Sequence, residues 1–410
     1  MKTIQKAMLA AGLCGALAAG VGYAQASNFQ VLHSFTGGTA DGAYPRGALI
    51  QSGSTLYGMT SDGGSGNNKG TIFSIADTGN SFTLLHSFTG GTADGANPWD
   101  SLIQSGTTLY GMTLFGGSGN YGTIFSESTS GGNPTLVHSF TGGSADGENP
   151  YGSLIQFGST LYGMTTSGGS AATGTIFSIP DTGGADSLLH SFTYGKYPQG
   201  SLIQSGSTLY GMTSAGGSSN FGTIFSIPYT GGTVTLLHSF TGGATDGAYP
   251  LWGSLIQSGS TLYGMTYAGG SGNFGTIFSI PAAGGPITLL HSFTGADGGG
   301  PLGSLIQSGS TLYGMTSNGG GGDGTIFSIA DIGTGFQVLH SFTGGAADGA
   351  WPYGSLIQSG STLYGMTLHG GSSDYGTIFS LSTPEPATLA LLAVGGMGLL
   401  ARRRKRVESW

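Results

Sequence analysis

The side chains best suited to acid–base or metal chemistry recur along this chain about every fifty residues. Imidazole is a common zinc ligand, but the ligands of one ion must lie within a few ångströms of it. Histidines spread one per repeat do not converge in this way, so we interpret them as hydrogen-bonding ties within or between repeats. They are His33, His86, His138, His190, His238, His291 and His340. The eighth, His369, is predicted to be a solvated loop residue.

Aspartates recur in the same rhythm, each followed by glycine. They are Asp41, Asp94, Asp146, Asp246, Asp297 and Asp348. Asp-Gly pairs favour tight turns and left-handed backbone, and this is the interpretation we favour. Calcium is the alternative, because it prefers carboxylate and carbonyl oxygens, although no copy has the dense alternating acids of an EF-hand loop. We therefore expect no cofactor.

Large aromatic residues flank the proline that follows most of these turns. They are Tyr44, Trp99, Tyr151, Tyr197, Tyr249, Trp252, Trp351 and Tyr353. Aromatic rings among small polar groups stack on sugar rings or anchor protein contacts, which makes these residues the candidate ligand-binding set. The alternative is that the rings fill gaps between neighbouring repeats, and the sequence leaves both interpretations open.

The elements that position these residues form a repeated unit of four short β-rich segments. In the fifth copy they are residues 254–257, 261–266, 275–280 and 287–293. The second contains Leu-Tyr-Gly-Met-Thr, whose tyrosine recurs seven times at intervals of 48 to 53 residues. Four strands in a period of this length are typical of a β-propeller blade. The 84 glycines also fit short strands joined by turns and exclude a mainly helical chain.

The two ends of the repeat array complement each other. Residues 29–35 contain a fourth strand without its first three, and the last copy contains three strands without the fourth. An open array would leave both sheet edges bare, whereas a ring pairs them. We therefore predict an all-β, seven-bladed propeller with four-stranded blades over residues 27–382, closed by the N-terminal strand in the C-terminal blade.

The N-terminus has the pattern of a secretory signal peptide, predicted over residues 1–26. Lys2 and Lys6 precede an apolar stretch, and Ala24-Gln25-Ala26 supplies a small-x-small cleavage pattern. The single cysteine, Cys14, lies inside this segment. We therefore expect export across the inner membrane and a mature protein without disulfides.

The C-terminal segment, residues 383–410, has the pattern of a different targeting signal. Pro384, Glu385 and Pro386 precede an apolar run and the basic cluster 402–406. The run is shorter than the ~20 residues that span a bilayer comfortably, and the basic cluster would hold its end on the cytoplasmic side. This segment resembles the PEP-CTERM sorting signal, which implies an exosortase-type sorting enzyme as partner. We expect a transient membrane anchor and an extracellular or cell-surface location.

The repeat itself, with Gly-Ser-Leu-Ile-Gln, Leu-Tyr-Gly-Met-Thr, Gly-Thr-Ile-Phe-Ser and Leu-Leu-His-Ser-Phe, resembles the GloVer tandem repeat. The resemblance covers essentially the whole mature chain. It implies an extracellular repeat protein with interchangeable C-terminal anchors, PEP-CTERM among them, and brings no catalytic residues.

Charge excludes one class of function. Between the two terminal segments, three basic residues face sixteen acidic ones, a formal charge of −13. A nucleic-acid-binding surface needs a basic stripe, so no nucleic acid is expected as a partner. We predict a secreted, non-catalytic binding or structural module that contacts polysaccharide or a matrix protein. The alternative is a secreted glycoside hydrolase or lyase that uses acids of the loop face, and it requires unrepeated carboxylates gathered in one pocket.

Overall fold

A computed structural model describes residues 28–65 and 67–383 of the chain. The predicted signal peptide and the sorting residues Pro384, Glu385 and Pro386 lie outside these described residues. Residues Phe29–Ser382 form one compact unit. Within the described part, no helix has the length and apolar character that a membrane crossing requires.

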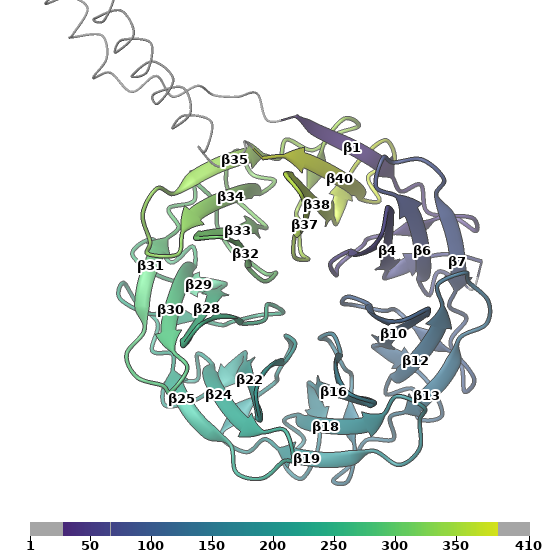
Figure 1. Ribbon diagram of the computed structural model, residues 1–410, viewed down its shortest axis with the longest axis horizontal. Coiled ribbons are helices and arrows are strands. Elements are labelled where there is room, and N and C mark those ends of the chain that lie inside the picture. Colours follow the sequence, from purple (N-terminus) through teal and green to yellow (C-terminus); the bar gives the residue numbers. More distant parts are fainter. Residues whose placement is uncertain (1–27, 66, 384–410) are drawn as a thin grey trace, which may run out of the picture. The chain divides into compact units, whose positions relative to one another are not determined.

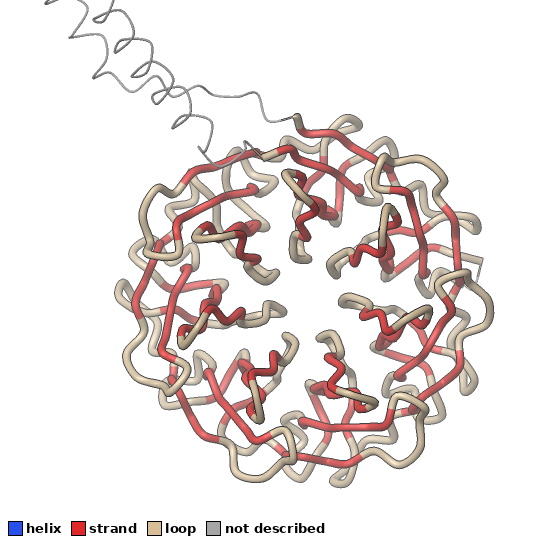
Figure 2. Tube along the Cα trace, in the orientation of Figure 1, coloured by secondary structure: helices blue, strands red, loops and turns tan. Residues whose placement is uncertain are grey.

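The compact unit is an all-β, seven-bladed propeller, which confirms the predicted fold (Figure 1). Each blade is a four-stranded antiparallel sheet, and its four strands lie side by side from the centre of the ring to its rim. Loops connect the strands within each blade and between blades (Figure 2). The sheets are β3-β4-β6-β7 (blade 1), β9-β10-β12-β13 (blade 2), β15-β16-β18-β19 (blade 3), β21-β22-β24-β25 (blade 4), β27-β28-β30-β31 (blade 5), β32-β33-β34-β35 (blade 6) and β37-β38-β40-β1 (blade 7).

The innermost strands are short, and the second strands carry Leu-Tyr-Gly-Met. The innermost strands are β3 (Ile50–Ser52), β9 (Ile103–Ser105), β15 (Ile155–Phe157), β21 (Ile203–Ser205), β27 (Ile256–Ser258), β32 (Ile306–Ser308) and β37 (Ile357–Ser359). The second strands are β4 (Thr55–Thr60), β10 (Thr108–Thr113), β16 (Thr160–Thr165), β22 (Thr208–Thr213), β28 (Thr261–Thr266), β33 (Thr311–Thr316) and β38 (Thr362–Thr367).

The third strands carry Thr-Ile-Phe-Ser, and the outermost strands carry the repeated histidine. The third strands are β6 (Thr71–Ala76), β12 (Thr123–Ser128), β18 (Thr175–Pro180), β24 (Thr223–Pro228), β30 (Thr276–Pro281), β34 (Thr325–Ala330) and β40 (Thr377–Ser382). The outermost strands are β1 (Phe29–Ser34), β7 (Thr83–Ser87), β13 (Thr135–Ser139), β19 (Ser187–Ser191), β25 (Thr235–Ser239), β31 (Thr288–Ser292) and β35 (Gln337–Ser341). In the fifth copy the predicted first strand, 254–257, begins two residues too early.

The ring closes as predicted. Strand β1 pairs antiparallel with β40 in a register that sets Phe29 opposite Leu381 and Ser34 opposite Thr377. The N-terminal strand thereby covers an edge that would otherwise expose unpaired backbone groups.

Apolar cores lie between adjacent blades. Tyr57, Met59 and Ile72 of blade 1, for example, pack with Leu109 and Phe125 of blade 2. Both faces of each blade are covered in this way, which explains why the same apolar residues recur seven times.

The glycine of Leu-Tyr-Gly-Met-Thr is required by a neighbouring aromatic ring. Gly58 of β4 lies opposite Phe73 of β6. A Cβ at position 58 would lie 2.5 Å from Cζ of Phe73 and 3.1 Å from Cδ2 of Leu49. The phenylalanine ring therefore lies across a strand that has no side chain at that point.

The loops that enter the blades pair with the loops between second and third strands of the same repeat. This places both sets on one face of the ring, hereafter the loop face. The pairs are β2 (Gly42–Ala43) with β5 (Asp62–Gly63), β8 (Gly95–Ala96) with β11 (Phe115–Gly116), β14 (Gly147–Glu148) with β17 (Ser167–Gly168), β20 (Gly195–Lys196) with β23 (Ala215–Gly216), β26 (Gly247–Ala248) with β29 (Ala268–Gly269), and β36 (Gly349–Ala350) with β39 (His369–Gly370). Blade 6 keeps a single bridge, Gly299 to Asn318.

Candidate binding site at the propeller hub

The repeated histidines and aspartates pair with each other. In six of the seven copies, Nε2 of the histidine lies 3.0–3.3 Å from an oxygen of the aspartate in the following loop. We call these pairs the outer clamps. They are His33–Asp41, His86–Asp94, His138–Asp146, His238–Asp246, His291–Asp297 and His340–Asp348.

Each clamp carboxylate is also held by its own loop. Asp246 accepts hydrogen bonds from the backbone N–H and the hydroxyl of Thr241, both at 2.8 Å, and from the N–H of Gly247 at 2.7 Å. Burial alone would raise the pKa of Asp246, but the bonds from His238, Thr241 and Gly247 outweigh it and lower that pKa. The carboxylate oxygens are thus engaged in fixing the turn, which supports the turn interpretation over calcium binding.

The eight candidate aromatic residues divide into two groups according to their position beside the loop proline. Residues directly before the proline have positive φ, between 52° and 57°, in all seven loops. Residues after the proline approach the centre of the ring. Trp99, Trp252 and Tyr353 of this second group line one pocket at the centre, and Tyr151 packs against Trp99 with ring centroids 5.2 Å apart.

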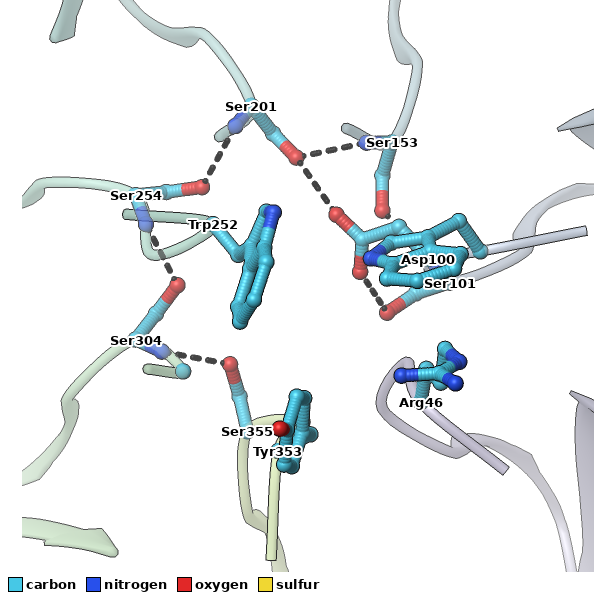
Figure 3. A pocket seen from close by; sticks show the side chains of 13 residues that line it. Arg46, Asp100, Ser101, Ser153, Ser201, Trp252, Ser254, Ser304, Tyr353 and Ser355 are labelled. Atoms are coloured by element: carbon cyan, nitrogen blue, oxygen red, sulfur yellow. Dashed lines mark hydrogen bonds between the residues drawn. The ribbon is translucent and has the colours of Figure 1, made fainter. Parts of the chain in front are cut away.

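The centre of the loop face, hereafter the hub, is a ring of serines joined head to tail. The position lies two residues before each blade's first strand, and its backbone N–H donates to the hydroxyl of the serine at the same position in the next blade at 2.7–3.1 Å (Figure 3). Ala48 occupies the position in blade 1 and has no hydroxyl to accept a bond from blade 7. The residues are Ala48, Ser101, Ser153, Ser201, Ser254, Ser304 and Ser355.

The residue before each hub serine is glycine in six copies and aspartate in one. A Cβ at Gly200 would overlap the carbonyl oxygen of Gly253 in the next loop. Neighbouring loops therefore approach each other too closely here for a side chain. Asp100 stands at this position in blade 2. Its carboxylate accepts hydrogen bonds from the hydroxyls of Ser101 at 2.9 Å and Ser201 at 3.3 Å.

Burial raises the pKa of Asp100, and the hydrogen bonds from Ser101, Ser153 and Ser201 oppose that rise. Among the described residues that line the hub pocket, Asp100 is the one acid. The pocket therefore lacks the paired carboxylates that glycoside hydrolysis needs.

Arg46 and the rings of Trp99, Trp252 and Tyr353 line the hub pocket together with Asp100, and Figure 3 shows Arg46, Trp252 and Tyr353 around it. The guanidinium carbon of Arg46 lies 3.9 Å from the ring centroid of Trp99 and 5.6 Å from that of Tyr353. Burial lowers the pKa of Arg46, although a guanidinium remains protonated throughout the physiological range. The hub pocket has a volume of about 90 Å³.

Trp252 reaches the hub because its loop has one residue more than the others. Leu251 separates Trp252 from the loop proline. The ring of Trp252 stacks on that of Tyr353, with the ring centroids 5.3 Å apart. Its indole Nε1 is buried and has no hydrogen-bond partner among the described residues. An unpaired buried donor is unfavourable, so a ligand acceptor that reached this N–H would gain a hydrogen bond.

A second pocket, of about 370 Å³, adjoins the hub between blades 5, 6 and 7. Blade 6 has Gly300 where the other loops have a larger residue before the proline. A Cβ on Gly300 would lie 2.9 Å from the ring of Tyr267. The pocket is lined by Leu251, Trp252, Tyr267, Leu302, Ser317, Asn318, Trp351 and Tyr353. We call it the aromatic pocket.

The remaining candidate aromatics contact neighbouring loops. Tyr44 lies 5.5 Å from Tyr375, and Tyr249 lies 5.2 Å from Phe221, between ring centroids. Tyr197 is exposed. The expectation for His369 was wrong: the imidazole is partly buried between the rings of Tyr44 and Trp351, at 5.2 Å and 4.9 Å.

His190 is the repeated histidine that forms no clamp among the described residues, because the shortened loop that leads into blade 4 lacks the aspartate. Tyr194 precedes the loop glycine in place of aspartate, and burial lowers the pKa of His190. A pocket of about 300 Å³ opens beside His190, lined by apolar residues such as Val234 and Leu236. Lys196 is not among the described residues that line it.

Sequence reasoning missed Arg46, Asp100 and the serine ring as parts of the site. The signal was present as a departure from the repeat: Asp100 interrupts Gly-Ser-Leu-Ile-Gln, and Ala48 replaces its serine.

These features define a closed seven-bladed β-propeller with the unrepeated residues Arg46 and Asp100 in its axial pocket. The chain belongs to the Gloeobacter/Verrucomicrobia repeat family, whose model matches residues 18–177, 68–273 and 197–394. This confirms the resemblance of the repeat. Among curated proteins, none matches the sequence.

Solved structures with the same fold have mixed functions. An oligogalacturonate lyase in complex with manganese is similar with a TM-score of 0.56 and 11% identity, over 88% of this chain and 95% of the lyase. An oligogalacturonate lyase from Vibrio parahaemolyticus gives 0.53 and 11%, over 88% and 95%. A puromycin-hydrolyzing peptidase from Mycobacterium tuberculosis gives 0.53 and 11%, over 86% of this chain and 55% of the peptidase. At these identities the likeness extends to the fold alone.

Proposed function

We propose that this protein is an exported, non-catalytic propeller that binds polysaccharide at its loop face. The observation that carries the proposal is the aromatic pocket beside the hub. Trp252, Tyr267, Trp351 and Tyr353 line it together with the polar side chains of Ser317 and Asn318.

This lining matches the surface of a sugar. The C–H face of a pyranose packs on an aromatic ring, while its hydroxyls need donors and acceptors at the edge of the ring. Trp252 Nε1 offers an unpaired donor, and Asn318 offers its side-chain oxygen and second N–H, since its first N–H donates to Ser317 Oγ and that hydroxyl donates to the carbonyl oxygen of Gly300. A volume of about 370 Å³ falls in the range of small-molecule sites.

The catalytic alternative, a glycoside hydrolase or lyase, has less support. A glycoside hydrolase would need a second carboxylate near Asp100, and the described residues lining the hub pocket provide none. The lyases among the structural neighbours share the fold at 11% identity, which carries no residue roles to this chain.

One experiment separates the two. The purified full chain is applied to a glycan array, and each bound glycan is then incubated with the protein and examined for shortened or unsaturated products by mass spectrometry. Retention without products supports the proposal, and products that disappear in Asp100→Asn support the enzyme. Absence of glycan binding, together with capture of a purified matrix protein, would favour a protein partner instead.

Location is part of the same proposal. The signal-like residues 1–26 and the PEP-CTERM-like residues 383–410 support export, a membrane anchor before processing, and recognition by an exosortase-type enzyme. Mass spectrometry of protein recovered outside the cells would show loss of both segments. A mature chain that retains Pro384–Pro386 and the basic cluster would contradict tail removal.

A further inference from the structure

A second departure from the repeat lies on the rim between blades 2 and 3, at residues that line none of the three pockets described above. The cluster consists of the clamp His138–Asp146 and one additional acid, Asp186. Each of the three residues offers one ligand atom, and these atoms all lie within 4.8 Å of one another. His138 comes from the outermost strand β13, Asp146 from the loop after it, and Asp186 directly precedes β19, the outermost strand of blade 3.

The third residue is what distinguishes this clamp from the other five. The side chain at the position of Asp186 covers the histidine of the preceding blade. In blades 1 and 6 it is Phe82 stacked on His33 at 4.1 Å and Phe336 stacked on His291 at 3.8 Å, between ring centroids. At all six other copies the residue is apolar: Phe29, Phe82, Pro134, Val234, Ile287 and Phe336.

Asp186 places a second carboxylate beside the clamp, at a position where the other six copies have an apolar side chain. Asp146 is itself fixed as a carboxylate by the N–H of Thr141 at 2.7 Å and by that of Gly147. The clamp therefore presents one oriented carboxylate and one imidazole to a second carboxylate that has replaced an apolar cover.

We propose that His138, Asp146 and Asp186 bind a divalent transition-metal ion, for which Zn²⁺ is the probe. One imidazole and two carboxylates are a donor set that suits zinc, with water completing the coordination. Two ligands each 2.0–2.2 Å from a tetrahedral zinc lie roughly 3.4 Å apart, so the most widely separated ligand atoms of the cluster would move closer by up to about 1.4 Å on binding. The hydrogen bonds to Asp146 already supply the outer contacts that orient a metal ligand.

The bound ion would link the outermost strand of blade 2 to the start of the outermost strand of blade 3. This proposal does not depend on glycan binding at the hub.

Isothermal titration of the full chain, without a histidine tag and after removal of metals with EDTA, tests the site. We expect one Zn²⁺ per chain, and Asp186→Asn should weaken binding at least tenfold. The matched control is Asp181→Asn, five residues earlier in the same connection and bonded to Gln156 rather than to a histidine. It should bind as the wild type does.

A gain-of-site variant keeps the test independent of any loss of folding. Ile287→Asp places an acid at the equivalent position beside His238 and Asp246, and should add a second Zn²⁺. Circular dichroism checks that each variant is folded. Absence of zinc binding, equal binding by Asp186→Asn, or binding of Ca²⁺ without Zn²⁺ would overturn the proposal.

Discussion

The outer clamps and the hub are built from the same seven copies but use them in opposite ways. Around the rim, a histidine and an aspartate are repeated in six copies with nearly the same geometry. At the hub, the residue after the proline varies, with five residue types in seven loops. It is Arg46, Trp99, Tyr151, Gln199, Leu251, Leu302 and Tyr353 in turn. Repetition therefore serves the scaffold, and departures from it build surfaces that can recognise a ligand.

The largest effect should come from breaking a repeated scaffold position. Gly58→Val places a branched side chain where a Cβ would already lie 2.5 Å from Phe73. We expect the free energy of unfolding to fall by about 3 kcal/mol, as overpacking of a filled core does. Urea denaturation measures it. In the control Gly53→Ala, the added Cβ meets nothing within 4 Å, and the positive φ limits the cost to about 1 kcal/mol. Equal losses in both variants would contradict the packing argument.

Breaking an unrepeated hub position should separate binding from stability. Trp252→Ala removes the ring shared by the hub pocket and the aromatic pocket. We expect glycan affinity to fall about 30-fold, the loss of about 2 kcal/mol typical of a central aromatic contact. Titration with a glycan found on the array measures this.

The matched control for that prediction is Phe157→Ala. Phe157 is an exposed aromatic residue at the end of β15, where the hairpin turns on the face opposite the loops. It should leave affinity unchanged, and an equal loss in both variants would move the site away from the hub.

One clamp can be weakened without altering its shape. In Asp246→Asn the bonds from Thr241, Gly247 and His238 lose their charged acceptor, and we expect a loss of about 1.5 kcal/mol in the free energy of unfolding. The folded protein lowers the pKa of Asp246 from 3.8, so its contribution is complete above that pH and is lost as the pH falls through the lower folded value. The difference between wild type and variant should therefore shrink below pH 3.8. A difference that stays constant down to strong acid would contradict the role of the charge.

The fold could be predicted in detail because each of its determinants is repeated. Leu-Tyr-Gly-Met-Thr marks the second strand seven times, and the partial copies at the two ends specify closure. The hub could not be predicted in the same way. Whether a loop aromatic faces the axis depends on its place before or after the proline, where the backbone turns through positive φ. The eight aromatics therefore looked equivalent in sequence, although Trp252 and Tyr44 lie in different surroundings.

Departures from the repeat are the part of the sequence that indicates the unrepeated sites. Asp100 for glycine, Asp186 for an apolar residue and Glu127 for isoleucine or leucine each replace a repeated residue by an acid, and two of these three lie in blade 2. Sequence alone does not distinguish an acid at a ligand site from an acid buried at a structural cost. The surroundings do, since Asp100 accepts hydroxyl bonds at the hub whereas Glu127 lies within the core.

Glu127 gives the smallest predicted effect and the sharpest test of this distinction. It is 3% exposed in β12, and neither carboxylate oxygen has a hydrogen-bond partner of good geometry among the described residues. Burial raises its pKa above the usual 4.5, with a smaller opposing effect from His86. Because the folded state then holds its proton more tightly, Glu127 destabilises the protein increasingly as the pH rises above 4.5.

Glu127→Ile restores the residue found at the equivalent positions Ile75 and Ile179. We expect the free energy of unfolding to rise by about 1 kcal/mol at pH 8, as when an unpaired buried polar group is replaced by an apolar one, and by less at pH 4. Glu127→Gln keeps the shape and the unpaired polar atoms but removes the charge, so it should recover only the part of the gain that depends on pH. If Glu127→Ile instead weakens the protein or reduces glycan binding, Glu127 belongs with Asp100 among the functional departures, and the separation between rim and hub does not extend to the core of blade 2.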